Sequence, residues 1–116
     1  MKTCKVSNAC GIIAGHVRIA DHFFTRFIGL QGRKALAEGE GLLIRPCRQI
    51  HTFFMRFTLD VLFISEEGVV VHIIEYFGKN LISPDIRLAH DVIELKGGTV
   101  SKKYIHIGDT ILFEDR

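Results

Sequence analysis

The sequence predicts a single α+β domain, mostly β, built on a small barrel-like sheet, antiparallel or mixed, with one main helix. Six or seven short apolar runs are separated by glycine, proline, asparagine and aspartate, which are typical turn residues. One stretch, at about 21–30, repeats its apolar residues at helical spacing. The length of 116 residues and the hydrophobic content of 47% fit one domain, residues 1–116, with its own core.

The N-terminal third predicts a hairpin followed by the main helix. Strands are expected at 2–7 and 12–20, because a turn-forming Asn-Ala-Cys-Gly sequence separates two apolar runs. Asp21 is a suitable N-cap for the helix, which is expected to dock an apolar face on the sheet. That face consists of Phe23, Phe24, Phe27, Ile28 and Leu30.

Shorter elements are expected in the rest of the chain. The predicted strands lie at 41–44, 69–76, 90–95 and 110–114, with a long loop at 77–87 and a short helical turn at about 99–104. Between them lies the most apolar stretch, residues 48–64, which reads RQIHTFFMRFTLDVLFI and predicts one or two buried strands. The predicted core comprises Phe53, Met55, Phe57, Val61, Phe63, Val70, Ile93 and Leu95.

Four polar residues lie within that apolar stretch and form the candidate ligand-binding site. On a continuous strand, side chains alternate between faces, so Thr52, Arg56 and Asp60 would share one face, and His51 would lie at the rim of the other. The planar guanidinium of Arg56 suits a carboxylate or a phosphate. The alternative is a structural arginine that binds acceptors inside the fold. The candidate acceptors are Asp60, Glu94 and Asp109.

Several strings of the sequence resemble one protein family. They are RFIGLQGRKAL, GEGLLIRPCRQIHTFFMRFTLDVLFISEEGVVV, VIELKGG and IGDTILF, which lie between residues 26 and 113, and the likeness extends from about residue 17 to residue 113. The chain is similar in them to domain-of-unknown-function family 192 (DUF 192). The resemblance implies a compact, mostly β domain with a helix packed on it, and it implies no particular activity.

Composition argues against several classes of function. The net charge is only +2, from 15 basic and 13 acidic residues, which argues against nucleic acid as a partner. No apolar run has the roughly 20 residues that span a bilayer, so no membrane association is expected and the expected location is cytoplasmic. The three cysteines are expected to be thiols. The six scattered histidines lack metal-ligand spacing, so neither a metal nor another cofactor is expected.

The function that the sequence favours is a binding or accessory module with a polar, anion-facing site around Thr52, Arg56 and Asp60. Its partner would be a small molecule or a protein, and the chain would be a monomer or a small homo-oligomer. A nucleic-acid-binding barrel is the first alternative. A small hydrolase is the second, with His51 or Asp60 as the base and Arg56 stabilising an anion. The sequence leaves open whether the protein is an enzyme.

Overall fold

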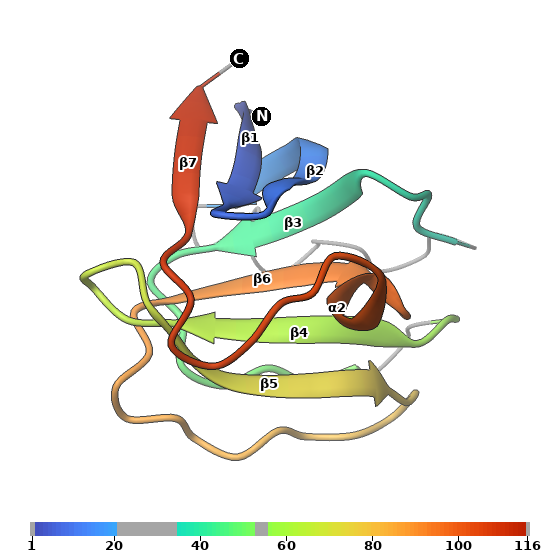
Figure 1. The fold of residues 1–116 in the computed structure, drawn as a ribbon. Coiled ribbons are helices and arrows are strands. Elements are labelled where there is room, and N and C mark those ends of the chain that lie inside the picture. The colour runs from blue at the N-terminus through green and yellow to red at the C-terminus, as the bar shows by residue number, and fades with distance from the viewer. Residues whose placement is uncertain (1, 21–34, 53–55, 116) are drawn as a thin grey trace.

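The computed structural model describes residues 2–20, 35–52 and 56–115. Within these residues the chain forms strands and one short helix (Figure 1). The strands are β1 (Thr3–Asn8), β2 (Gly11–Ala20), β3 (Glu40–Ile44), β4 (Leu59–Ile64), β5 (Val70–Phe77), β6 (Asp91–Lys96) and β7 (Leu112–Asp115), and the helix is α2 (Thr99–Lys102). No helix among the described residues is long and apolar enough to cross a membrane.

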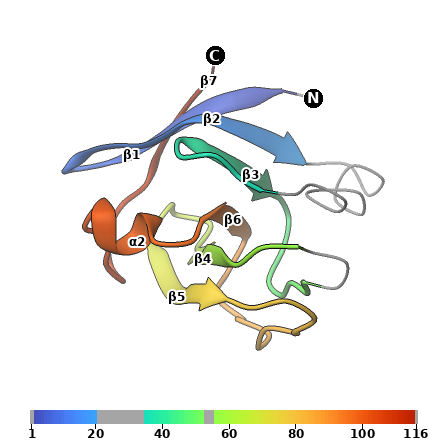
Figure 2. The same cartoon turned by 90° about the vertical axis from the view of Figure 1, so that its right-hand side faces the viewer.

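The described strands form one mixed sheet in the order β5-β4-β6-β3-β2-β1-β7. The β2–β3 pair is parallel and the other pairs are antiparallel. The sheet curls, so that β1 and β2 lie opposite β5, with α2 on one side between them (Figure 2). A single antiparallel bridge, Val69 to Thr110, links the start of β5 to the chain that leads into β7.

Burial of the strands follows their position in the sheet. In β1 buried and half-buried residues alternate, as expected for a strand with one covered face. All six residues of β4 are buried, and so are the first five of β6. These two strands are adjacent and lie between β5 and β3, where both faces of the sheet are covered, and their sequences LDVLFI and DVIEL are correspondingly apolar.

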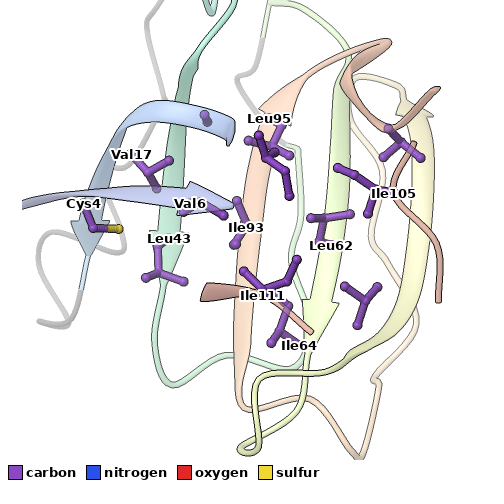
Figure 3. Close-up of a cluster of buried hydrophobic side chains, with 14 residues drawn as sticks. Cys4, Val6, Val17, Leu43, Leu62, Ile64, Ile93, Leu95, Ile105 and Ile111 are labelled. Carbon is purple, nitrogen blue, oxygen red and sulfur yellow. The ribbon is translucent and has the colours of Figure 1, made fainter. Parts of the chain in front are cut away.

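Two apolar layers cover the two faces of the sheet. The first layer includes Val6, Val17, Leu43, Leu62, Ile93 and Ile105, and Figure 3 shows these side chains gathered on the face that carries α2. The second layer, on the opposite face, includes Ala20, Leu42, Leu59, Val61, Phe63 and Val92. Successive side chains along β4 and β6 therefore point into different layers. Whether a residue holds an odd or an even position in its strand decides which layer surrounds it.

The mostly β fold is confirmed, whereas the barrel is not. The strand order ends with β5 and β7, which do not pair along their length, so the sheet is open. The helical turn is present as α2, and the expected main helix at 21–30 lies outside the described residues. Val61, Phe63, Val70, Ile93 and Leu95 are buried as predicted, and Phe57 is partly buried against the second layer. The remaining predicted core residues, Phe53 and Met55, are also outside the described residues.

The prediction of strands over residues 48–64 is wrong for the described residues 48–52 and 56–58. A strand begins only at Leu59, and His51 makes an isolated bridge with Ile82. The physical reason is local pairing: the Thr52 amide donates to the Leu81 carbonyl, and the Thr52 carbonyl accepts from the Asn80 amide. Residues 50–52 therefore bond to the segment 78–90, which connects β5 to β6, and among the described residues the side-chain alternation of β4 begins only at Leu59.

Packing at the centre of the sheet yields a first prediction. A Cβ atom added at Gly41 would lie 2.9 Å from the backbone oxygen of Glu94 and 3.0 Å from a methyl group of Leu95. We expect Gly41→Ala to lower the free energy of unfolding by about 1–3 kcal/mol, because the two strands would have to separate. Urea unfolding measures this.

The matched control is Gly78→Ala, where the nearest atom would lie 3.4 Å away on the flexible side chain of Leu81. Its free energy of unfolding should stay within about 1 kcal/mol of wild type. Equal stability of the two variants would contradict the close approach of β3 and β6.

Candidate functional site

Asp60 on β4 is fully buried, and backbone groups use both of its carboxylate oxygens. Its Oδ1 accepts the Tyr76 amide at 2.9 Å, and its Oδ2 accepts the amides of Gly98 and Val100 at 3.1 and 2.8 Å. The last two amides lie at the N-terminus of α2, where backbone N–H groups lack partners within the helix. Asp60 therefore acts as a remote cap for α2.

The Tyr76 amide is available because the β4–β5 ladder is irregular there. Leu59 pairs with Phe77 and Val61 pairs with Ile74, so two residues of β5 lie opposite Asp60 alone. Tyr76 adopts a left-handed conformation at this bulge, with φ of 52°. Its ring covers the glycines before α2, since a Cβ added at Gly98 would lie 3.0 Å from the Tyr76 hydroxyl. Asp60 thus joins three segments of the chain.

Thr52 is also fully buried, with its hydroxyl bonded inside the protein. The Oγ1 atom donates to the Gly78 carbonyl at 2.7 Å and accepts the Leu81 amide at 2.9 Å. These bonds fix the start of the segment 78–90, which connects β5 to β6. Its neighbour His51 is exposed. Ligand binding by either residue remains a prediction.

Arg56 is exposed, and within the described part of the chain no hydrogen bond or ion pair to its guanidinium is found. None of the acceptors expected for it is used: Asp60 binds backbone amides, and Asp109 binds Asn8 and the amide of His106. The structure therefore does not join Thr52, Arg56 and Asp60 into one polar pocket. An anion-binding role for Arg56 stays a hypothesis about an exposed side chain.

A second polar cluster lies where β3 ends and β6 begins. Asp91 is buried and accepts Arg45 at 3.2 Å through Oδ2, while its Oδ1 lies 2.8 Å from Nδ1 of His90. The Arg45 guanidinium also lies over the Phe113 ring, with its Cζ atom 5.4 Å from the ring centroid. These contacts tie β3, β6 and β7 together, so the cluster has a structural role. It leaves the buried Nε of Arg45 without a hydrogen-bond partner among the described residues.

Glu94 differs from these groups because its burial is not compensated. Its exposed fraction is 6%, and among the described residues no hydrogen bond or ion pair to its carboxyl group is found. Its cross-strand neighbours are Leu42 and Val61, both apolar and buried. Burial raises the pKa of Glu94 to about 7, so the group exchanges its proton near neutral pH.

Arg18 lies on the same face of the sheet as Glu94. Arg18 pairs with Leu42 in register, and Leu42 pairs with Glu94, so the three residues form a row across β2, β3 and β6. The Arg18 Nη2 atom is buried, and no hydrogen-bond partner is found for it in the described ranges. We call this set the Arg18–Glu94 row. The Arg18 guanidinium and the Glu94 carboxyl group thus face an apolar layer, and each can still form hydrogen bonds.

Sequence reasoning placed Glu94 only among the acceptors for Arg56 and did not single out Arg18. The available signal was the alternation in Val92-Ile93-Glu94-Leu95, which puts a carboxyl among apolar residues on a predicted strand. What the sequence could not give is the register that aligns β2, β3 and β6.

Among the residues that the structure describes, no group of three or more His, Cys, Asp or Glu side chains could hold a metal ion.

The Asp60 bonds yield a second prediction. Asparagine has one acceptor oxygen and one NH₂ group, so in Asp60→Asn at least one backbone amide would face a donor. We expect a loss of about 2–4 kcal/mol in the free energy of unfolding, since each unsatisfied buried group costs about 1–3 kcal/mol. Denaturant titration measures it.

Asp85→Asn serves as the control, because Asp85 pairs with Arg48 at 3.1 Å with both side chains about half exposed. Such a pair contributes less than about 1 kcal/mol. An Asp60→Asn variant no less stable than Asp85→Asn would show that the three amides do not depend on the carboxylate.

Comparison with known proteins agrees with the fold. A protein of unknown function from Novosphingobium aromaticivorans DSM 12444 matches with a TM-score of 0.83 and 20% identity, over 95% of this chain and 83% of that chain. A "putative transcription regulator" from Sinorhizobium meliloti 1021 matches with a TM-score of 0.81 and 25% identity, over 97% of this chain and 92% of that chain. No curated protein matches the sequence. The model of DUF192, described as "Uncharacterized ACR", matches residues 6–113. The chain therefore belongs to the DUF192 family.

Proposed function

We propose that this protein is a binding module for a small molecule and that the Arg18–Glu94 row is its binding site. The observation that carries the proposal is the uncompensated burial of Glu94. A buried carboxyl group normally has a hydrogen-bond or ionic partner, because burying it without one destabilises the fold. Asp60 and Asp91 follow that rule in the same sheet. A ligand would supply the partner that Glu94 lacks.

A more polar row of residues lies next to the Arg18–Glu94 row. Two positions further along the strands, and therefore on the same face, come His16 on β2, Glu40 on β3 and Lys96 on β6. His16 and Lys96 are exposed and Glu40 is half-buried, so the face changes from apolar to polar within one step. Solvent therefore lies beside the row on this side, and a ligand would reach the buried Glu94 only by displacing side chains of the second apolar layer.

The other functions considered have less support. An enzyme is one alternative, because a pKa near 7 also suits proton transfer by Glu94. In the described residues, however, no nucleophilic side chain is hydrogen-bonded to Glu94, so the substrate itself would have to supply the nucleophile. Nucleic-acid binding would fit the description of the Sinorhizobium meliloti protein. Against it, Lys5, Arg45, Arg48 and Lys102 each pair with an acidic residue of this chain, which reduces the positive charge available to phosphates.

The raised pKa of Glu94 yields a third prediction. Its ordinary value is 4.5 and burial raises it to about 7, so the folded state holds the proton more tightly than the unfolded state. Its stabilising contribution is complete below about pH 4.5 and is lost as the pH rises through 7. By pH 8, Glu94→Gln should be more stable than wild type by about 3 kcal/mol, with no difference near pH 4.5.

Urea unfolding of both proteins between pH 4.5 and pH 8 measures this. The difference between them isolates Glu94, because Arg18, His16, Glu40 and Lys96, the charged or titratable neighbours on that face, are common to both. A difference that stays constant across this range would mean that Glu94 does not titrate in it.

Binding itself yields a fourth prediction. Ligand-observed NMR with a fragment set of small amines, carboxylates and amino acids should find compounds that bind wild type. For these compounds, Glu94→Gln should weaken binding by about tenfold or more, because a charge-assisted hydrogen bond contributes about 1.5–3 kcal/mol.

Arg56→Met is the matched control, because it removes an exposed cation outside the row. Binding should be unchanged in that variant. Compounds that depend on Arg56 and not on Glu94 would place the site at the exposed arginine instead. The absence of any compound whose binding depends on Glu94 would overturn the proposed function.

A further inference from the structure

The segment 96–104, which begins at the end of β6 and contains α2, carries a local excess of positive charge. It reads KGGTVSKKY, with three lysines and no acidic residue, although basic and acidic residues are nearly balanced over the whole chain. The segment is compact, because the Thr99 hydroxyl donates to the Lys96 carbonyl and the Lys103 amide donates to the Thr99 carbonyl. It lies at the end of the sheet where β5 and β6 finish (Figure 1).

Glu38 lies among these three lysines. Its exposed carboxylate forms an ion pair with Lys102. The hydrogen bond and the charge of Lys102 lower the pKa of Glu38, and the charges of Lys103 and Lys96 lower it further. Among the described residues no ion pair to Lys96 or Lys103 is found. One carboxylate therefore faces three cations, and two of the three are available to an anion from outside the chain.

Two exposed tyrosines flank the lysines. Tyr104 follows Lys103 directly and is 69% exposed, and Tyr76 at the end of β5 is 61% exposed. Tyr76 lies over the glycines that separate Lys96 from α2, since a Cβ added at Gly97 would lie 3.2 Å from its Cδ1 atom. Both tyrosines therefore lie on the surface beside the lysines and outside the apolar layers.

Tyr104 has a backbone conformation that bulky residues rarely adopt. Its φ is 55°, in the left-handed region. Tyr76 has a similar φ of 52°, but there the bond from its amide to Asp60 accounts for the conformation. The Tyr104 amide has only a long bond to the Ser101 carbonyl, at 3.4 Å. Asparagine or glycine would adopt this conformation at lower cost, so neither packing nor backbone geometry explains an exposed ring here.

The residues that border or belong to α2 on this side form one surface, which we call the α2 surface. They are Tyr76, Lys96, Lys102, Lys103 and Tyr104. We infer that the α2 surface binds single-stranded nucleic acid, with its lysines at the phosphates and its tyrosine rings stacked on bases. The surface is open, so this partner needs no cavity, and the inference does not rest on Glu94.

The chemistry of the partner follows from the combination of charge and rings. An acidic polypeptide would satisfy the lysines but would leave the exposed rings without flat partners. A duplex offers phosphates, but its base faces are stacked on one another. A single strand offers phosphates and free base faces together, and stacking on aromatic side chains is tolerant of sequence.

Fluorescence anisotropy with a labelled single-stranded oligonucleotide of mixed sequence tests the inference. Wild type should bind it at low salt and should bind about tenfold more weakly when salt rises from about 50 to about 200 mM, as two or three phosphate contacts predict. A duplex of the same sequence should bind about fivefold or more weakly than the single strand, since its bases cannot stack on the rings. Poly-glutamate at equal total charge should compete poorly.

Variants separate the rings from the charge. Tyr104→Asn should weaken binding by about fivefold or more, because one stacked base is lost, and asparagine tolerates the left-handed backbone. Tyr104→Phe keeps the ring and should bind like wild type. Lys103→Gln should reduce the slope of log affinity against log salt by about 0.7, the effect of one phosphate contact. Its control is Lys5→Gln, which removes the same charge on β1, where Lys5 pairs with Glu114, and should leave the slope unchanged.

Far-ultraviolet circular dichroism checks the fold of each variant. Equal competition by poly-glutamate, with Tyr104→Asn binding like wild type, would overturn the inference and assign the α2 surface to an acidic polypeptide. Equal affinity for duplex and single strand would overturn the stacking of bases. No binding of the oligonucleotide at low salt would overturn the inference outright. None of these results affects Glu94-dependent binding of small molecules, so the proposed function is tested separately.

Discussion

The carboxylate of Asp60 is the interaction on which the arrangement of the fold depends. It binds a β-bulge amide of β5 and two amides at the start of α2, so one side chain on β4 fixes elements that follow it by 16 to 40 positions. Backbone groups in a β-bulge and at a helix N-terminus lack partners of their own. Without the carboxylate, the Tyr76 turn and the cover formed by α2 over the first apolar layer would both lose their anchor.

Asp60 on β4 and Glu94 on β6 show that the face on which a buried carboxyl group lies decides whether it finds a hydrogen-bond partner. Asp60 on β4 pairs in register with Leu95 on β6, and Glu94 pairs with Val61, so the two carboxyls are neighbours in the sheet but point into opposite layers. The layer with α2 supplies backbone donors to Asp60. On the other face the cross-strand neighbours of Glu94 are the apolar residues Leu42 and Val61. The same chemical group therefore has backbone partners on one face and no partner among the described residues on the other.

Local sequence signals gave the strands and the mostly β class, because alternation and turn residues act over a few positions. They could not give the conformation of residues 48–52 and 56–58. There, apolar composition favoured a strand, yet Thr52 bonds to residues 78–81, a pairing decided by tertiary contacts. The predicted site failed to assemble for the same reason, since Thr52, Arg56 and Asp60 share a face only on a continuous strand. Arg18 and Glu94 share one through the register of three strands, which a single sequence does not encode locally.

An uncompensated Glu94 couples ligand binding to proton binding. Ionising this carboxyl inside an apolar layer destabilises the folded state, which is why burial raises its pKa to about 7. An ammonium group placed beside it would favour the ionised form, lower that pKa and release a proton on binding. By linkage, the same ligand stabilises the fold most where the empty site destabilises it most, above pH 7. On the proposed function, the destabilisation that Glu94 causes without a partner would therefore favour a partner that carries a positive charge.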